Sequence, residues 1–203
     1  MRPIGVPAAL GVFYHHVAYR LYVKCRTAGN ETLDGLYFVR SDADSTLVGR
    51  FGNLFTEFRF HWGTIELGVD SNTVRLRVRG GDDAQGDADL HAACGQRAGF
   101  RTRLDPGSPF SSVEEAAAFL KYRPLGLSPP GGGRRIRLAE VFRDGAGWRE
   151  TSVDVTIARW GFFDDLGQKE ICLETATRVT PINYRWRLGK SVAAWPTAHA
   201  PHA

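Results

Sequence analysis

The sequence is poor in the residues that build metal sites, disulfide frameworks and membrane spans. Its three cysteines, Cys25, Cys94 and Cys172, lie far apart and occur in no Cys-x-x-Cys or Cys-x-x-His spacing, which argues against a zinc site and against a disulfide framework. No run of about 18 apolar residues is present, so no membrane span is predicted. The first ten residues carry one arginine and a short apolar stretch broken by proline, too poor for a signal peptide. These absences favour a cytoplasmic protein with reduced thiols.

The charge distribution lacks the footprint of a nucleic-acid-binding protein. The 26 lysines and arginines are interspersed with 22 aspartates and glutamates, for a net charge of +4. Nucleic-acid-binding proteins usually gather their cations on one face or along one helix. Arg77 and Arg79 instead alternate with Leu76 and Val78, which is the pattern of a solvated strand face. We therefore expect no nucleic acid partner.

The residues that are abundant favour β-structure. Hydrophobic residues make up 43% of the 203 residues and aromatic residues 11%, which is enough to build the core of one domain. Aromatic and β-branched residues suit pleated, half-buried surfaces. Strands are predicted over residues 13–24, 35–41, 57–69, 73–79, 134–142, 152–160, 169–179 and 181–188.

Two stretches have the pattern of short helices. Residues 42–54 place apolar side chains near helical spacing after a capping residue, either Asp44 or Ser45. Residues 111–122 open with a Ser-Ser-Val-Glu-Glu capping-box pattern and continue through an alanine-rich run. Residues 80–96 are rich in glycine, aspartate and alanine and are predicted to form an exposed loop.

The predicted elements define a mainly β fold with about two short helices. Many strands and few helices fit a closed or nearly closed antiparallel β-barrel. We expect residues 1–190 to form one barrel-like domain. Residues 191–203 are rich in alanine, proline and histidine and are predicted to form a disordered tail.

Residues 14–67 carry three runs that resemble one bacterial family. Residues 17–23 contain an Arg-x-Tyr-Val core, residues 34–45 read Asp-Gly-Leu-Tyr-Phe-Val-Arg-Ser-Asp-Ala-Asp-Ser, and residues 58–62 read Phe-Arg-Phe-His-Trp. A fourth run, residues 112–127, is similar to the family's helix. Together they resemble the uncharacterised YqjF-like family, a branch of the acetoacetate decarboxylase-like superfamily. The resemblance implies a decarboxylase-like barrel, shortened here at its N-terminus.

The lysine pair that gives acetoacetate decarboxylases their chemistry has no counterpart at the corresponding positions of this sequence. In those enzymes a Schiff-base lysine beside a second lysine has a lowered pKa and acts as a nucleophile. Alignment through His61 places Phe58-Arg59-Phe60 at that position, and the guanidinium of Arg59 stays protonated. The chain has four lysines, none beside another: Lys24, Lys121, Lys169 and Lys190. We therefore expect no Schiff-base decarboxylation, and we expect no cofactor and no metal.

Four residues on the predicted strands are candidates for binding a ligand. Arg20 and Arg40 are flanked by apolar residues, and Arg59 and Tyr37 lie on neighbouring segments of the same region. An arginine that points into a barrel can hold a carboxylate by two parallel hydrogen bonds. The competing interpretation of Arg20 and Arg40 is a buried ion pair with one of three nearby carboxylates, Asp42, Asp44 and Glu57.

Two histidines are candidates for proton transfer. His61 and His16 can act as general bases because the pKa of histidine lies near neutrality. His15 and His16 point to opposite faces of a strand, so only one of them can enter a pocket. The competing interpretation is a satisfied core or surface histidine. Nucleophilic hydrolysis by Ser41 with His61 is disfavoured because no Gly-x-Ser-x-Gly elbow is present.

Three functions remain open from the sequence. The leading hypothesis is a small-molecule-binding barrel that captures an anionic or keto-acid-like ligand, such as a small organic acid. The second is a non-covalent, lyase-like acid–base enzyme that uses His61 or His16. The third is a scaffold or interaction protein with a filled barrel. A barrel that lacks strands needs its C-terminal strands, or the second subunit of a homodimer, to cover its edge.

Overall fold

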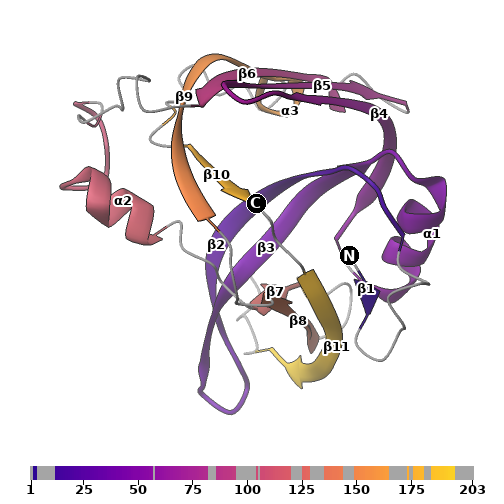
Figure 1. Ribbon diagram of the computed structural model, residues 1–203. Helices are drawn as coiled ribbons and strands as arrows, with labels where there is room; N and C mark the ends of the chain where they lie inside the picture. The colour runs from indigo at the N-terminus through magenta and orange to yellow at the C-terminus, as the bar shows by residue number, and fades with distance from the viewer. Residues whose placement is uncertain are drawn as a thin grey trace.

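The strands and helices were assigned in a computed structural model of the chain (Figure 1). The structure describes residues 2–3, 12–56, 58–81, 86–94, 104, 106–119, 125–128, 135–143, 149–164, 173, 176–180 and 184–194. The strands are β1 (Arg2–Pro3), β2 (His16–Arg26), β3 (Thr32–Ala43), β4 (Phe60–Val69), β5 (Thr73–Gly80), β6 (Ala88–Cys94), β7 (Leu125–Leu127), β8 (Arg135–Arg143), β9 (Arg149–Trp160), β10 (Thr177–Thr180) and β11 (Tyr184–Ala193). The helices in this part of the chain are α1 (Thr46–Phe55), α2 (Val113–Phe119) and α3 (Gly161–Asp164). None of these helices is long and apolar enough to cross a membrane.

The long hairpin of β2 and β3 lies at the centre of the molecule (Figure 1). Its antiparallel register runs from the pair His16–Ala43 to the pair Arg26–Thr32. The turn between the strands contains Asn30 with a φ of 66°, a left-handed conformation that asparagine adopts more readily than most residues. The turn joins β2, which begins and ends later than the predicted strand 13–24, to β3, which is longer than the predicted strand 35–41.

The second edge of β3 is shared between two other strands. Near its C-terminal end, β3 pairs in parallel with β4, from Ser41–Phe60 to Ala43–Trp62. Nearer its N-terminal end, β3 pairs in parallel with β7 through Leu36–Gly126 and Tyr37–Leu127. The sheet thus divides at β3 into an upper arm (β4, β5, β6, β9 and β10) and a lower arm (β7, β8, β11 and β1), which Figure 1 shows above and below the hairpin.

The predicted closed antiparallel barrel is wrong. Over the described residues the eleven strands form a mixed, open sheet whose path begins at β1 and ends at β10. The parallel pairing of β3 with β4 follows from α1, because a helical crossover returns the chain to start the next strand in the same direction. Alternating hydrophobicity identifies a strand but carries no information on the direction in which its neighbour runs.

Helix α1 is held at both ends and is aligned on β4. The Ser45 side chain accepts a hydrogen bond from the Val48 N–H at 3.3 Å, so Ser45 is the cap of the two residues, Asp44 and Ser45, that the sequence left open. The Asn53 side chain forms two hydrogen bonds with the main chain of Phe60 in β4. Its Nδ2 donates to the Phe60 carbonyl at 2.8 Å, and its Oδ1 accepts from the Phe60 N–H at 2.7 Å. These two bonds fix the start of β4 beside the end of β3.

The upper arm confirms the predicted alternation and corrects one predicted loop. Val78 is fully buried in a cluster with Ile65 and Ala88, whereas its neighbours Arg77 and Arg79 are exposed. Part of the expected loop over residues 80–96 is strand β6, which pairs with β5 on one side and β9 on the other. Alanine and aspartate have low strand propensity, but two pairing partners override it here.

The remaining elements follow the sequence in part. Ser112 accepts a hydrogen bond from the Glu115 N–H at 3.1 Å, which confirms the predicted start of α2. Helix α3, a single turn, was not predicted. Of the predicted strand 169–179, β10 accounts for residues 177–179, and much of the rest lies outside the described residues. The predicted start of the disordered tail is wrong, because residues 191–193 belong to β11; residues 195–203 lie outside the described residues.

Candidate functional site

The two faces of the central hairpin carry different chemistry. Directly paired residues share a face and successive residues alternate between faces. Tyr19 pairs with Arg40 and Val17 with Asp42, and these four residues define the Tyr19 face. The other face is the His16 face, defined by five residues: His16, Ala18, Arg20, Phe38 and Ser41.

A bulge at Val39 sets which β3 residues share a face. Arg20 pairs with Phe38 while Tyr19 pairs with Arg40, so β3 carries one residue more than β2 at this point. Phe38 and Arg40 therefore lie on opposite faces although they are two residues apart. Phe38 stacks on Phe58 with ring centroids 4.1 Å apart, on the same side as Ser41.

A buried ion pair occupies the Tyr19 face. Arg40 Nε donates to the two carboxylate oxygens of Asp42 at 2.9 and 3.1 Å, and Arg40 Nη2 lies 2.8 Å from Asp42 Oδ1. The two residues are 3% and 0% exposed. Gly86 lies against the pair so closely that a Cβ there would be 2.8 Å from Arg40 Nη2. This arrangement is the ion-pair interpretation that the sequence left open for Arg40.

Tyr19 lies beside this ion pair in an aromatic cluster. Its ring centroid is 5.9, 4.8 and 5.6 Å from those of Trp160, Phe162 and Phe163. The hydroxyl is buried and has no hydrogen-bond partner among the described residues. Burial and, secondarily, the Asp42 carboxylate raise the pKa of Tyr19, while Arg40 lowers it less. The phenol is therefore neutral at physiological pH.

The structure places the two candidate histidines on different faces. His61 on β4 is in register with Asp42, so it belongs to the Tyr19 side of the sheet. It is half-buried and makes no hydrogen bond or ion pair with any residue that the structure describes. His16 lies on the opposite side, so His16 and His61 cannot act on one bound molecule.

Two buried polar atoms without partners lie on the His16 face. Neither His16 Nε2 nor Ser41 Oγ has a hydrogen-bond partner within the described ranges. His16 pairs with Ala43 and Ser41 with Ala18, which makes His16 and Ser41 diagonal neighbours on adjacent strands. Diagonal neighbours lie roughly 7–8 Å apart at the backbone. The Phe60 ring lies beside His16, with centroids 5.1 Å apart.

The charge state of His16 is set by its surroundings. Burial, and secondarily the positive charge of Arg20, lower the pKa of His16 from 6.5 to about 4. The imidazole is therefore neutral at pH 7 and can donate or accept a hydrogen bond. Arg20 is exposed and forms no ion pair with a described residue, so its guanidinium is available to an anion.

His16 should make the protein sensitive to acid. The unfolded chain binds a proton at this residue near pH 6.5 and the folded chain only near pH 4, so stability is lost as the pH falls from 6.5 to 4. His16→Phe removes this titration. We expect the unfolding free energy of the variant to gain about 2 kcal/mol relative to wild type between pH 7.5 and 4.5. Urea denaturation of both proteins measures this change. If the unfolding free energies of variant and wild type differed by the same amount at both pH values, the prediction would be contradicted.

Arg59 and Tyr37 contact each other rather than a shared pocket with the other arginines. Arg59 has a φ of 53° and its guanidinium lies over the Tyr37 ring, 5.5 Å from the centroid. Its carbonyl accepts the Ser41 N–H at 3.1 Å. The contact is a cation–π pair that fixes the segment before β4. Of the four residues predicted to bind a ligand, Arg20 is the one on the His16 face.

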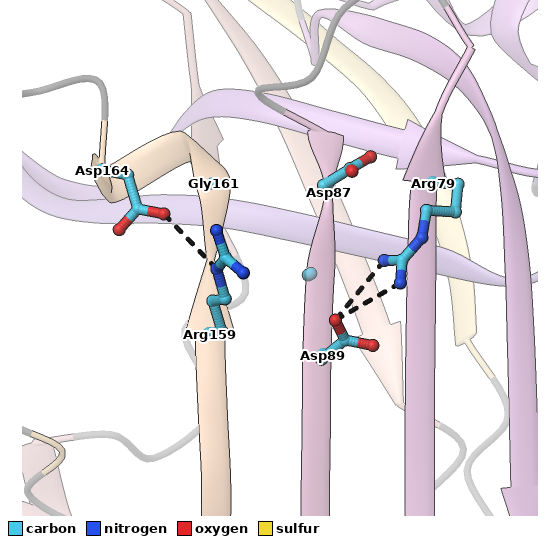
Figure 2. Close-up of a pocket in the computed structure, with 7 residues that line it drawn as sticks. Arg79, Asp87, Asp89, Arg159, Gly161 and Asp164 are labelled. Carbon is cyan, nitrogen blue, oxygen red and sulfur yellow. Dashed lines mark hydrogen bonds and ion pairs between the residues drawn. The ribbon is translucent and has the colours of Figure 1, made fainter.

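The structure also contains a cleft that the sequence did not predict. It has a volume of about 410 Å³ and lies on the outer surface of the upper arm, where β5, β6, β9 and α3 meet (Figure 2). It contains none of the predicted site residues. Its lining residues, which define the outer cleft, are Arg79, Asp87, Ala88, Asp89, Arg159, Gly161 and Asp164. No sequence pattern pointed to it, because β6 was predicted as part of a loop and α3 was not predicted.

The described residues supply neither a buried lysine nor a metal centre. Lys24 is 74% exposed and lies 3.9 Å from Asp34, and Lys190 is exposed. Lys121 and Lys169 lie outside the described residues. Within the described part of the chain, no three histidine, cysteine or carboxylate side chains are grouped closely enough to hold a metal ion.

Comparison with known proteins identifies one family and one fold. The model of the family DUF2071, described as "Uncharacterized conserved protein (COG2071)", matches residues 1–170. The crystal structure of acetoacetate decarboxylase from Legionella pneumophila is similar with a TM-score of 0.52 and 14% sequence identity, over 90% of this chain and 68% of that chain. No curated protein matches the sequence. The structural match shows an acetoacetate decarboxylase-like fold and nothing more about activity.

Proposed function

The chain belongs to the DUF2071 family, as its resemblance to the YqjF-like proteins predicted, and from this premise we propose that it binds a small organic acid on the His16 face. The observation that carries the proposal is the pair of buried, unpartnered polar atoms, His16 Nε2 and Ser41 Oγ. The two residues are diagonal neighbours on adjacent strands, which supports a ligand that would contact both.

The cost of these unpartnered atoms favours a ligand. A buried donor or acceptor without a partner costs about 1–3 kcal/mol, and such groups are rare in native proteins. A hydroxyl or carbonyl oxygen of a ligand that lies between His16 and Ser41 would satisfy both. Ser41 is 0% exposed, so hydrogen bonds formed there are protected from competition by bulk water.

Arg20 supplies the charge complement for an acid. It lies four residues after His16 on the same strand and on the same face, and no described carboxylate neutralises it. A guanidinium binds a carboxylate by two parallel hydrogen bonds. The ligand that fits these three side chains carries a carboxylate for Arg20 and a hydroxyl or keto oxygen for His16 and Ser41.

Binding is favoured over acid–base catalysis by the pKa of His16. A general base works best with a pKa near the operating pH, and a pKa of about 4 makes His16 a weak base at pH 7. The second candidate base, His61, lies on the other face of the sheet. Schiff-base chemistry needs a desolvated lysine, and both described lysines are exposed. We therefore propose ligand capture without covalent chemistry.

Thermal unfolding in the presence of small acids tests the proposal. We expect lactate, pyruvate or acetoacetate to raise the melting temperature by about 5–10 °C at 100 times Kd. Methylamine should have no effect. Ser41→Ala should leave the unliganded protein within about 1 kcal/mol of wild type, because it removes an unpaired hydroxyl, and should weaken acid binding.

Variants on β2 separate the proposed site from a general charge effect. Arg20→Gln should abolish the stabilisation by acids, whereas Lys24→Gln, which removes an exposed cation from the same strand, should retain it. The proposal fails if no acid stabilises the protein, which would favour a scaffold role. It also fails if Arg20→Gln and Ser41→Ala respond to acids as the wild type does.

A further inference from the structure

The outer cleft offers five charged side chains around a small floor. Its volume of about 410 Å³ lies within the range of roughly 300–1,000 Å³ that small-molecule sites occupy. We call Ala88 and Gly161, the two uncharged lining residues, the floor of the outer cleft. Ala88 is 2% exposed and packs in the core with Val78. Figure 2 shows the charged side chains on either side of this floor.

Each side of the outer cleft carries loose ion pairs. On one side, Arg79 Nη1 and Nη2 lie 3.5 and 3.4 Å from Asp89 Oδ2, and Arg77, from outside the lining, places its Nε 3.3 Å from Asp89 Oδ1. Arg79 Nη1 also donates to the Val78 carbonyl at 2.8 Å. On the other side, Arg159 Nε lies 3.8 Å from Asp164 Oδ2. A guanidinium has five N–H donors, and these contacts do not use all of them. Both lining arginines and both carboxylates therefore retain capacity for hydrogen bonds to a bound molecule.

Asp87 is held between the two pairs by main-chain hydrogen bonds. Its Oδ1 accepts the Gly80 N–H at 3.0 Å, and its carbonyl accepts the Gly161 N–H at 2.7 Å. The second carboxylate oxygen, Oδ2, has no described partner. Asp87 is thus a fixed anion at the centre of the outer cleft.

We propose that the outer cleft binds a small zwitterion of the amino-acid class, with a preference for one that carries an additional positive charge. Two arginines and three aspartates give the outer cleft a net charge of −1, from +2 and −3. A free basic amino acid has one carboxylate and two cationic groups, so its charges are opposite to those of the arginines and aspartates that line the outer cleft. Its carboxylate would bind Arg159, and its cationic groups would bind Asp87 and Asp89.

Titration calorimetry with free amino acids tests this site independently of the acid site. We expect lysine to bind more tightly than alanine, and alanine more tightly than glutamate. Butylamine and acetate, each with one of the two charges, should bind at least tenfold more weakly than lysine. Asp87→Asn keeps an oxygen that can accept the Gly80 N–H, and Arg159→Gln changes an exposed residue, so both variants should fold.

Each of these two variants should weaken lysine binding by about tenfold, which corresponds to about 1.4 kcal/mol. Arg187→Gln is the matched control, because it breaks an exposed ion pair with Glu140 in the lower arm, and Ser41→Ala is a second control. Both should bind lysine as the wild type does. The proposal is overturned if lysine does not bind, if Asp87→Asn and Arg159→Gln bind it normally, or if butylamine binds as tightly as lysine.

Discussion

Replacing Asp42 with alanine is expected to lower the free energy of unfolding by about 3–5 kcal/mol, the cost of leaving a buried charge uncompensated. Arg40 is 3% exposed and directs its Nε and Nη2 at the Asp42 carboxylate. Without Asp42 the guanidinium keeps the cost of desolvation and loses the attraction that offsets it. Urea denaturation at pH 7 measures the difference.

The contrast with an exposed ion pair makes this prediction specific. Asp34→Ala removes the partner of Lys24, whose atoms lie 3.9 Å apart with side chains 54% and 74% exposed, and should cost less than about 1 kcal/mol. The double variant Arg40→Met with Asp42→Leu should recover much of the stability that Asp42→Ala loses, because it removes both charges of the buried pair. Equal effects of Asp42→Ala and Asp34→Ala would show that the buried pair does not stabilise the hairpin.

Replacing Gly35 with alanine is expected to cost about 1–3 kcal/mol, because β3 and β7 approach closely at this point. A Cβ on Gly35 would lie 2.7 Å from the Leu125 carbonyl oxygen and 2.9 Å from Leu127 Cγ. The backbone contact cannot be relieved by a change of rotamer, so the two strands must separate. The lower arm is joined to β3 through β7, and it should lose protection from hydrogen exchange.

Gly49→Ala is the matched control for this variant. Gly49 lies in α1, and a Cβ there would meet no atom within 4 Å. Alanine in a helix is favoured over glycine by about 0.5–1 kcal/mol, so the control should be more stable than wild type. If Gly35→Ala were as stable as Gly49→Ala, the close approach of β3 and β7 would be contradicted.

Local structure could be predicted from this sequence because it depends on neighbouring residues. The alternation of Arg77 and Arg79 with buried Val78, and the cap at Ser45, are read directly from spacing. The parallel pairing at β3 depends on contacts between Ser41 and Phe60, far apart in the chain, and no local pattern records them. For the same reason β6, with its alanines and aspartate, was predicted as a loop.

The candidate site could be predicted only in part. His16, Arg20 and Arg40 were identified as polar residues on strands, and a buried ion pair of Arg40 was the competing interpretation, with Asp42 as one of three possible partners. The bulge at Val39 decides which face Phe38 joins, and a one-residue insertion in a strand leaves no signal in the periodicity. Ser41 gained significance only when its burial without a partner was known.

The central claim is that an organic acid binds against His16, and an NMR titration of the histidine ring nitrogens measures this contact directly. Addition of the acid that stabilises the protein most should shift the Nε2 resonance of His16. The bound anion should also raise the pKa of His16 from about 4 toward its ordinary value of 6.5. The ring-nitrogen resonances of His61, on the opposite face, should not respond to the acid. A protein stabilised by the acid with the His16 resonance and pKa unaltered would contradict the account.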